Sequence, residues 1–255
     1  MNNEPKCWIC GKTADSREHV IKKTDLVRAY GKGSFSSETG PAHVKDGKIK
    51  TLQGPDSTRV KYQPSLCQDC NGAFTQPFDL AYDKFIDWVL QNEESVLHHR
   101  FIDFQEVYGS DFAVSQTNLF KYFVKAFGCR LVDAGQAVPP DLVNLLGRER
   151  FLTALRLTFS VSEDILLMPH EDRDGFIGKG DLLVWKVDAD VNGGVGYSFK
   201  EHVSWLFVDF LYGIAAEPRT GSVWIADARV VYLGSFSSLT VEQRQEFIEK
   251  IRGES

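Results

Sequence analysis

Four of the five cysteines form two Cys-x-x-Cys pairs, Cys7 with Cys10 and Cys67 with Cys70. In a reducing compartment such pairs favour metal binding over disulfide formation. Four thiolates around one ion make a closed tetrahedral site, which leaves no position for water and is therefore structural. The spacing predicts one zinc ion that stabilises this part of the chain. The fifth cysteine, Cys129, lies in the apolar stretch FKYFVKAFGCRL and is interpreted as a buried structural thiol.

A carboxylate, an imidazole and an amide accompany these cysteines. Glu18 and His19 lie between the two pairs, and Asn71 follows the last cysteine directly. A carboxylate and an amide carbonyl are oxygen ligands that suit a hard cation such as Mg²⁺. An imidazole, with a pKa of about 6.5, suits a general base at neutral pH. A lone histidine is usually structural, but this combination predicts two metal ligands and a base.

The segments CWICG, REHVI and LCQDCNGAF follow the order C-x-x-C, (D/E)-H-(V/I) and C-x-x-C-(H/N). This order resembles the HNH endonucleases, also called ββα-metal or His-Me finger nucleases, and the form with Asn after the last cysteine is similar to endonuclease VII. The resemblance covers less than a third of the chain. It implies that the four paired cysteines hold zinc, that Glu18 and Asn71 hold a catalytic Mg²⁺ or Mn²⁺ ion, and that His19 deprotonates water. The catalytic ion would neutralise the charge that develops on the phosphate.

The chain departs from the HNH pattern in two respects. Glu18 stands where some members have Asp, and no Asn lies between His19 and Cys67 to serve as the central residue of the triplet. Gln63 is a candidate to replace that Asn by position and His43 is a weaker one, the alternative being that either is a plain loop residue. These departures bear on the rate of catalysis more than on the fold.

Positive charge is concentrated in the first part of the chain. Residues 1–66 carry 12 Lys and Arg against 7 Asp and Glu, a net charge of +5, and the remaining residues carry 17 against 28, a net of −11, which together make the −6 of the whole chain. A basic surface would suit contacts with nucleic-acid phosphates, although a solvated loop explains these residues equally well. The candidate contacts are Lys45, Lys48, Lys50, Arg59 and Lys61.

Local patterns predict the elements around these residues. The segment KKTDLVRAYG predicts a short helix that ends at Gly31, and DGK at 46–48 indicates a hairpin turn. A longer helix is expected at 74–99 and would pack back onto the cysteine pairs. Asp79 and Asp83 lie four residues apart on that helix and are interpreted as surface carboxylates.

The later part of the chain predicts more helices and a sheet. From residue 151 on, segments rich in β-branched and aromatic residues alternate with Gly, Asp and Pro, which is typical of strands. The segment HVSWLFVDFLYGI could form a strand or a short buried helix. Thr240 and Gln243 resemble a capping box at the start of a last helix. Further helices are expected at 115–134 and 140–146.

The composition, with 43% hydrophobic and 25% charged residues, is that of a folded soluble protein. The sequence contains neither a secretory signal pattern nor an apolar run long enough for a membrane span, so we expect a cytoplasmic protein with no membrane partner. The expected fold class is α+β. It comprises a ββα-metal (HNH) module with a pair of zinc knuckles at residues 1–100 and a mixed helix and sheet region of unassigned role at residues 101–255.

These observations predict a metal-dependent HNH endonuclease that hydrolyses phosphodiester bonds of DNA. The resemblance suggests a setting such as phage defence, with a second copy of the chain or a defence-system protein as a further partner. One alternative is a catalytically weakened zinc module that binds nucleic acid or a partner protein without cutting, which the absent central Asn favours. A third interpretation places the activity in the C-terminal region, where no nucleophile or phosphate-binding loop is recognisable.

Overall fold

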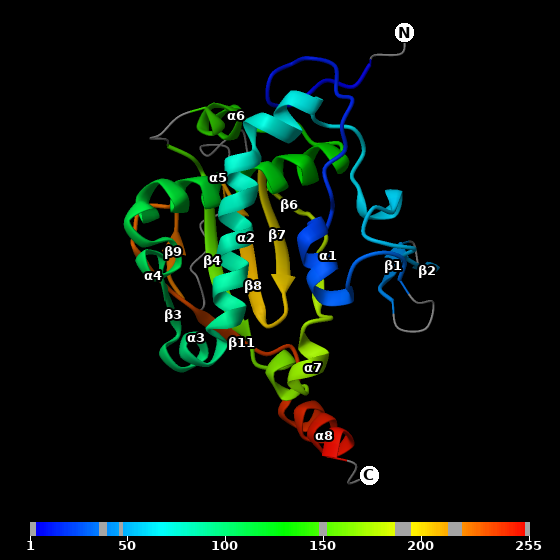
Figure 1. The fold of residues 1–255 in the computed structure, drawn as a ribbon, viewed down its shortest axis with the longest axis vertical. Helices are drawn as coiled ribbons and strands as arrows, with labels where there is room; N and C mark the ends of the chain where they lie inside the picture. Colours follow the sequence, from blue (N-terminus) through cyan, green and yellow to red (C-terminus); the bar gives the residue numbers. More distant parts are fainter. Residues whose placement is uncertain are drawn as a thin grey trace.

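The computed structural model describes residues 4–35, 40–45, 48–147, 152–186, 195–213 and 221–252. It combines helices with one large and two small sheets, which confirms the predicted α+β class in its general form. Helix α2 crosses in front of the large sheet in Figure 1, and the two ends of the chain lie at opposite ends of the molecule. Within the described ranges, none of the helices has both the length and the apolar character needed to cross a lipid bilayer.

The large sheet has seven strands in the order β11-β4-β8-β7-β5, with β6 also paired to β7 and β9 paired to β4. Its pairs are antiparallel except for β11 with β4, which is parallel. The segment HVSWLFVDFLYGI forms the end of β7, a turn and β8 instead of a helix, and buried and half-buried residues alternate along β8 as a strand requires. The strands are β4 (Leu155–Ser162), β5 (Ile177–Lys179), β6 (Leu183–Lys186), β7 (Val195–Val203), β8 (Leu206–Tyr212), β9 (Val223–Trp224) and β11 (Gly234–Phe236).

Helices α2 and α5 pack against each other and against the large sheet. Phe85 of α2 and Phe123 of α5 both contact Phe159 of β4, with ring centroids 5.7 and 6.1 Å apart. One hydrophobic core therefore joins α2 to the elements that follow residue 100. The division into residues 1–100 and 101–255 stays a prediction. The helices of this layer are α2 (Gln76–Gln91), α3 (Glu93–His99), α4 (Phe104–Tyr108), α5 (Phe112–Asp133) and α6 (Pro140–Leu146).

Most of the predicted helices are present, with one difference. The short helix α1 (Lys23–Tyr30) ends before Gly31, whose φ of 80° lies in the region that favours glycine. The helix predicted at 74–99 is divided at Asn92, whose side chain donates a hydrogen bond back to the carbonyl of Trp88, 2.8 Å away. This local bond competes with continuation of the helix, so α2 and α3 are separate.

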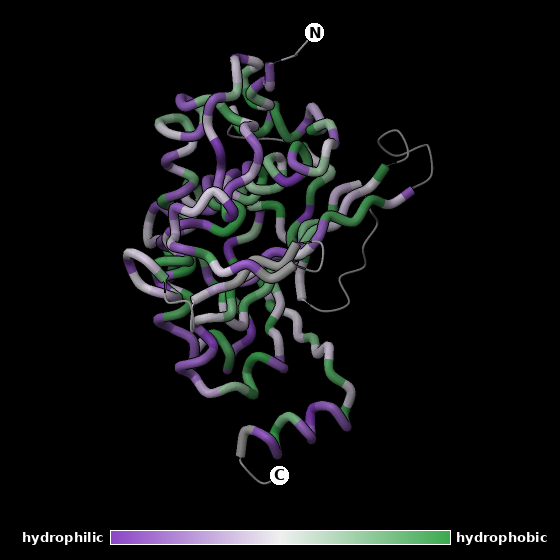
Figure 2. The backbone as a smooth tube through the Cα atoms, turned by 90° about the vertical axis from the view of Figure 1, so that its right-hand side faces the viewer, coloured by the Kyte–Doolittle hydropathy of each residue, from purple (hydrophilic) through white to green (hydrophobic). Residues whose placement is uncertain are grey.

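The last helix, α8 (Val241–Arg252), begins with the predicted capping box. The backbone amide of Thr240 donates to Gln243 Oε1 at 2.9 Å, and the amide of Gln243 donates to Thr240 Oγ1 at 3.2 Å. Figure 2 shows this largely hydrophilic helix projecting from the body of the molecule. The remaining elements are α7 (His170–Arg173) and the antiparallel pair β3 (Phe101–Asp103) and β10 (Val230–Tyr232).

The first part of the chain contains few regular elements. Strands β1 (Ala42–Lys45) and β2 (Lys48–Thr51) form an antiparallel pair, as the hairpin prediction requires, while residues 46 and 47 of the turn itself lie outside the described residues. Isolated antiparallel bridges join Ser16 to Leu66 and His19 to Lys61. The structure therefore brings the segment that contains Glu18 and His19 alongside the segment that leads into the second cysteine pair.

Candidate functional site

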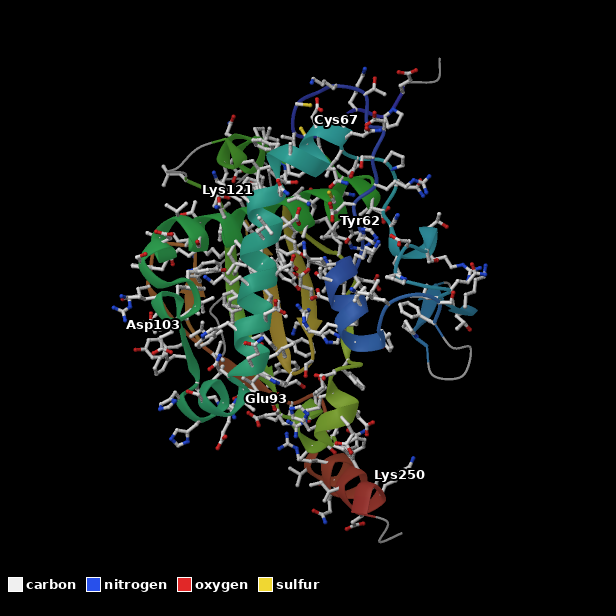
Figure 3. All side chains as sticks on the ribbon, in the orientation of Figure 1. Tyr62, Cys67, Glu93, Asp103, Lys121 and Lys250 are labelled. Atoms are coloured by element: carbon white, nitrogen blue, oxygen red, sulfur yellow. The ribbon has the colours of Figure 1, made fainter. Side chains whose placement is uncertain are left out.

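The four paired cysteines meet in one cluster at the end of the molecule that carries the N-terminus (Figure 3). Their sulfur atoms all lie within 4.8 Å of one another, and the Sγ atoms of Cys10 and Cys67 are 3.6 Å apart. Tetrahedral zinc with Zn–S bonds of about 2.3 Å requires sulfur atoms about 3.8 Å apart. The cluster is therefore compatible with the predicted structural zinc, which it would hold with four thiolates.

The environments of these thiols differ. Burial raises the pKa of Cys7 and of Cys70, whereas the backbone amide of Lys12 lowers the pKa of the exposed Cys10 to about 7. A zinc ion must displace the protons of Cys7 and Cys70, two of the three buried thiols of the cluster, when it binds. The energy of the four Zn–S bonds can offset the cost of this deprotonation. The burial of these thiols also protects the resulting site from solvent.

Cys129 is fully buried and packs with the paired cysteines, in agreement with its interpretation as a structural thiol. Ser65 Oγ donates to its Sγ at 3.6 Å, and burial raises its pKa to about 11. A thiol held in this state is a packing group and not a nucleophile.

Backbone pairing positions His19. The amide of Val20 donates to the carbonyl of Val60 at 2.6 Å, and the amide of Tyr62 donates to the carbonyl of Glu18 at 2.9 Å. These bonds hold residues 18–20 in an extended conformation directly against residues 60–62. The backbone of His19 is thus held in place on both sides, which positions its imidazole.

The imidazole of His19 has one ring nitrogen without a partner. Its Nε2 atom is buried and makes no hydrogen bond to any described residue. Burial lowers the pKa of the ring, while Glu18 and a hydrogen bond with the Pro55 carbonyl act in the opposite direction. Since Nε2 makes no hydrogen bond to the described residues and burial favours the neutral ring, this nitrogen is the candidate proton acceptor. A neutral imidazole with an unpaired nitrogen is what a general base requires.

Asn71 lies at the start of the helical segment that follows the second cysteine pair. Its backbone amide donates to the carbonyl of Cys67 at 2.9 Å. Asn71 itself belongs to a short π-helical turn at Cys70–Phe74. Its side-chain Nδ2 donates to Ser16 Oγ at 2.9 Å, while Oδ1 is buried with no hydrogen-bond partner among the described residues. An unpaired amide oxygen is a suitable ligand for a hard cation.

Glu18 is bound by a lysine that sequence reasoning missed. Nζ of Lys125, on α5, lies 2.9 Å from Glu18 Oε2 and 3.0 Å from Asp79 Oδ2, and the lysine side chain is only 2% exposed. Burial acts to lower the pKa of Lys125, but the carboxylates of Glu18 and Asp79 outweigh burial and raise it. The signal in the sequence was a charged residue inside the apolar run FVKAF, where a buried lysine needs a partner.

The carboxylates of α2 also have partners. Lys22 Nζ lies 3.0 Å from Asp79 Oδ1 and 3.7 Å from Asp83 Oδ2. The interpretation of Asp79 as a surface carboxylate is wrong, because it lies between two lysine ammonium groups with its side chain 25% exposed. Asp83 has a similar exposure and also contacts Thr24.

Glu18 and Asn71 both belong to the contact between residues 16–18 and the helical segment that begins at Cys70. Asn71 contacts Ser16, and Thr75, one helical turn further, accepts a 3.4 Å hydrogen bond from the lysine that holds Glu18. The helix thus runs along the segment 16–18. Among the described residues, however, the four cysteines are the only group of three or more His, Cys, Asp and Glu residues that could surround one ion.

One of the predicted nucleic-acid contacts, Lys61, lies beside His19. Lys61 pairs with His19 through the backbone, and Lys50 and Arg59 are exposed, with Arg59 Nη1 donating to the carbonyl of Thr51 at 3.0 Å. Lys48 lies in β2, and His43 and Lys45 lie in β1, but their side chains are outside the described part of the chain. Gln63 has an exposed side chain, and its amide donates to Asp133 Oδ1 at 3.2 Å.

Comparisons with protein families, with curated proteins and with solved structures find no significant match.

Proposed function

We propose that this chain is a metal-dependent endonuclease of the HNH type that hydrolyses phosphodiester bonds of DNA. The observation that carries this proposal is the buried, unpaired Nε2 of His19, in a segment paired with residues 60–62. After these residues the chain passes through the second cysteine pair and enters a helix at Asn71. Two paired extended segments, a cysteine knuckle and a helix, in this order, are the arrangement expected of a ββα-metal module.

The proposed chemistry assigns one role to each residue. Nε2 of His19 takes a proton from water, the water oxygen attacks the phosphorus, and the ester bond to one sugar oxygen breaks. That oxygen takes a proton from solvent, so the products are a phosphate monoester and a hydroxyl. Glu18 and the unpaired Oδ1 of Asn71 would hold a divalent ion, which supplies positive charge to the developing phosphorane when it is bound. The contact with Lys125 is made through Glu18 Oε2, which leaves the other oxygen for the ion.

A second candidate is a zinc module that binds nucleic acid or a protein without cutting. The ion pair between Lys125 and Glu18 favours it, because the carboxylate proposed as a metal ligand already has a cation beside it. The exposed side chain of Gln63 favours it too, since this side chain is the first candidate to replace the missing central Asn.

Cleavage assays with plasmid, single-stranded DNA and RNA, with and without Mg²⁺ or Mn²⁺, distinguish these candidates. The expected result is metal-dependent cutting of DNA, with His19→Ala slower by about 10²–10⁴ and unchanged in zinc content and DNA affinity. Glu18→Gln and Asn71→Ala should instead raise the Mg²⁺ concentration needed for half-maximal rate. The exposed His170 provides the control, since His170→Ala should cut like the wild type.

Two results would contradict the proposal. A His19→Ala protein that cuts as fast as the wild type would show that this imidazole is not the base. Binding of DNA without cutting under every metal condition would favour the second candidate.

A further inference from the structure

A lysine ammonium is enclosed by oxygen atoms next to the proposed catalytic residues. Lys125 Nζ lies 2.9 Å from Glu18 Oε2, 3.0 and 3.2 Å from the two carboxylate oxygens of Asp79, and 3.4 Å from Thr75 Oγ1. With 2% of its side chain exposed, the lysine cannot reach a nucleic acid. Any effect of Lys125 on the reaction must therefore pass through the groups it holds.

The two lysines of this cluster hold different carboxylates. Lys22 contacts Asp79 at 3.0 Å and Asp83 at 3.7 Å. Lys125 contacts Asp79 and also Glu18, with which no ion pair of Lys22 is found among the described residues. Removing one lysine or the other therefore changes the charge of the cluster equally, but only Lys125 acts on Glu18 directly.

We propose that Lys125 is an internal counter-ion of Glu18 and keeps the affinity of Glu18 and Asn71 for a divalent cation low. This inference rests on the proposed metal site. A divalent ion bound to Glu18 would lie within a few ångströms of the ammonium group, and at such distances in a partly buried site repulsion between cations is strong. Lys125 also contacts Oε2 and so competes with the ion for this oxygen of Glu18.

Lys125 has a second, opposing effect, because hydrogen bonds to a ligating carboxylate also orient it. Loss of orientation costs about 10–100-fold in metal affinity at such sites. The repulsion between the ammonium group and a doubly charged ion at such short range is larger than this cost of lost orientation. Removal of the ammonium should therefore strengthen metal binding. Lys125 is accordingly a positioning residue and not a catalytic one.

Titration of the zinc-loaded, full-length protein with Mn²⁺, followed by the electron paramagnetic resonance signal of the free ion, tests this inference. Lys125→Met keeps the length and the apolar stem of the side chain within α5 but removes its charge. We expect it to bind one Mn²⁺ at least tenfold more tightly than the wild type. Adding Glu18→Gln should abolish this gain, and Lys125→Arg, which keeps the charge, should bind as weakly as the wild type.

The matched control is Lys22→Met. It removes one positive charge from the same cluster without touching Glu18, so it should change Mn²⁺ affinity less than Lys125→Met does. Equal gains in the two variants, or no gain in Lys125→Met, would overturn the inference. Circular dichroism and zinc content verify that each variant is folded.

If Lys125→Met does not fold, the Mn²⁺ affinity of the wild-type protein tests the inference. Micromolar binding of Mn²⁺ by the wild type that is lost in Glu18→Gln would overturn the inference, whereas millimolar binding supports it. The titration contains no nucleic acid and measures no cleavage. If the Mn²⁺ results are as expected but the protein does not cut, the proposed function alone is contradicted. If the protein cuts but Lys125→Met has unchanged Mn²⁺ affinity, this inference alone is contradicted.

Discussion

The indole ring of Trp8 lies directly on the backbone of Gly128. A Cβ atom added to this glycine would be 2.5 Å from Cζ2 of the ring and 2.7 Å from Cη2. Trp8 stands between the first two cysteines, and Gly128 follows Lys125 by one turn of α5. The zinc-binding segment and the helix that holds Glu18 therefore fit together because position 128 has no side chain.

Gly128→Val should lower the free energy of unfolding by about 1–3 kcal/mol, which is typical of an overpacked core. The displaced group would be the Trp8 ring, and it has little space to move because it packs against the cores on both sides. Gly147→Val is the control, because a Cβ built there meets no atom of the described residues within 4 Å, its chain neighbours aside. Urea denaturation of both variants measures the difference. Equal stability of Gly128→Val and the wild type would show that the ring is not held at this position.

Elemental analysis should find one zinc per chain, and Cys67→Ser should lose it together with much of the stability of the N-terminal segment. Zinc retention should also fall as the pH is lowered, because protons compete for the thiolates and the pKa of Cys7 and of Cys70 is raised. Cys129→Ala is the control, since Cys129 is buried outside the four-sulfur cluster. A zinc-free wild type, or a zinc-loaded Cys67→Ser protein, would contradict the assignment.

The pKa of His19 should respond in opposite directions to two neighbouring charges. Burial sets it below the ordinary value of 6.5, Lys61 lowers it further, and Asp56 raises it. Lys61→Met should therefore raise the pKa of His19, and Asp56→Asn should lower it. Because only the neutral ring accepts a proton, Asp56→Asn should extend cleavage to lower pH and Lys61→Met should restrict it.

Titration of the histidine ring signals by NMR measures these shifts without reference to activity. Loss of one signal in His19→Ala identifies the resonance. Shifts of the same sign in Lys61→Met and Asp56→Asn would contradict the described surroundings of the ring.

Replacement of the predicted basic contacts should weaken nucleic-acid binding and reduce its salt dependence. Each phosphate contact contributes about 0.9 to the slope of log K against log salt on duplex DNA, so the loss of all four should reduce that slope by up to about 3.6. Lys250→Met on α8, far from the cysteine cluster in Figure 3, is the control for removal of one charge. If the nucleic-acid affinity and the salt slope are unchanged, these residues are a solvated surface and do not contact nucleic acid. The four replaced residues are Lys48, Lys50, Arg59 and Lys61.

The sequence by itself determined the features that depend on neighbouring residues. The spacing of the paired cysteines indicated one metal site, Gly31 indicated where α1 ends, and Thr240 with Gln243 indicated the start of α8. These features follow from local geometry: a two-residue spacing brings thiols together, glycine tolerates a positive φ, and a capping box closes within one turn. The possible metal site of four cysteines, the short helices and the general α+β class could accordingly be predicted.

Only the tertiary structure decided which distant residues meet. Lys125 and Asp79 lie far from Glu18 in the chain, and no periodicity links a lysine in an apolar helix to a carboxylate near the first cysteine pair. An ammonium group is stable in a core only where carboxylates from other segments surround it, which depends on how α2, α5 and the N-terminal segment pack together. The contact of Trp8 with Gly128 is determined in the same way, because the space at a glycine exists only after the helix and the cysteine knuckle have been brought together.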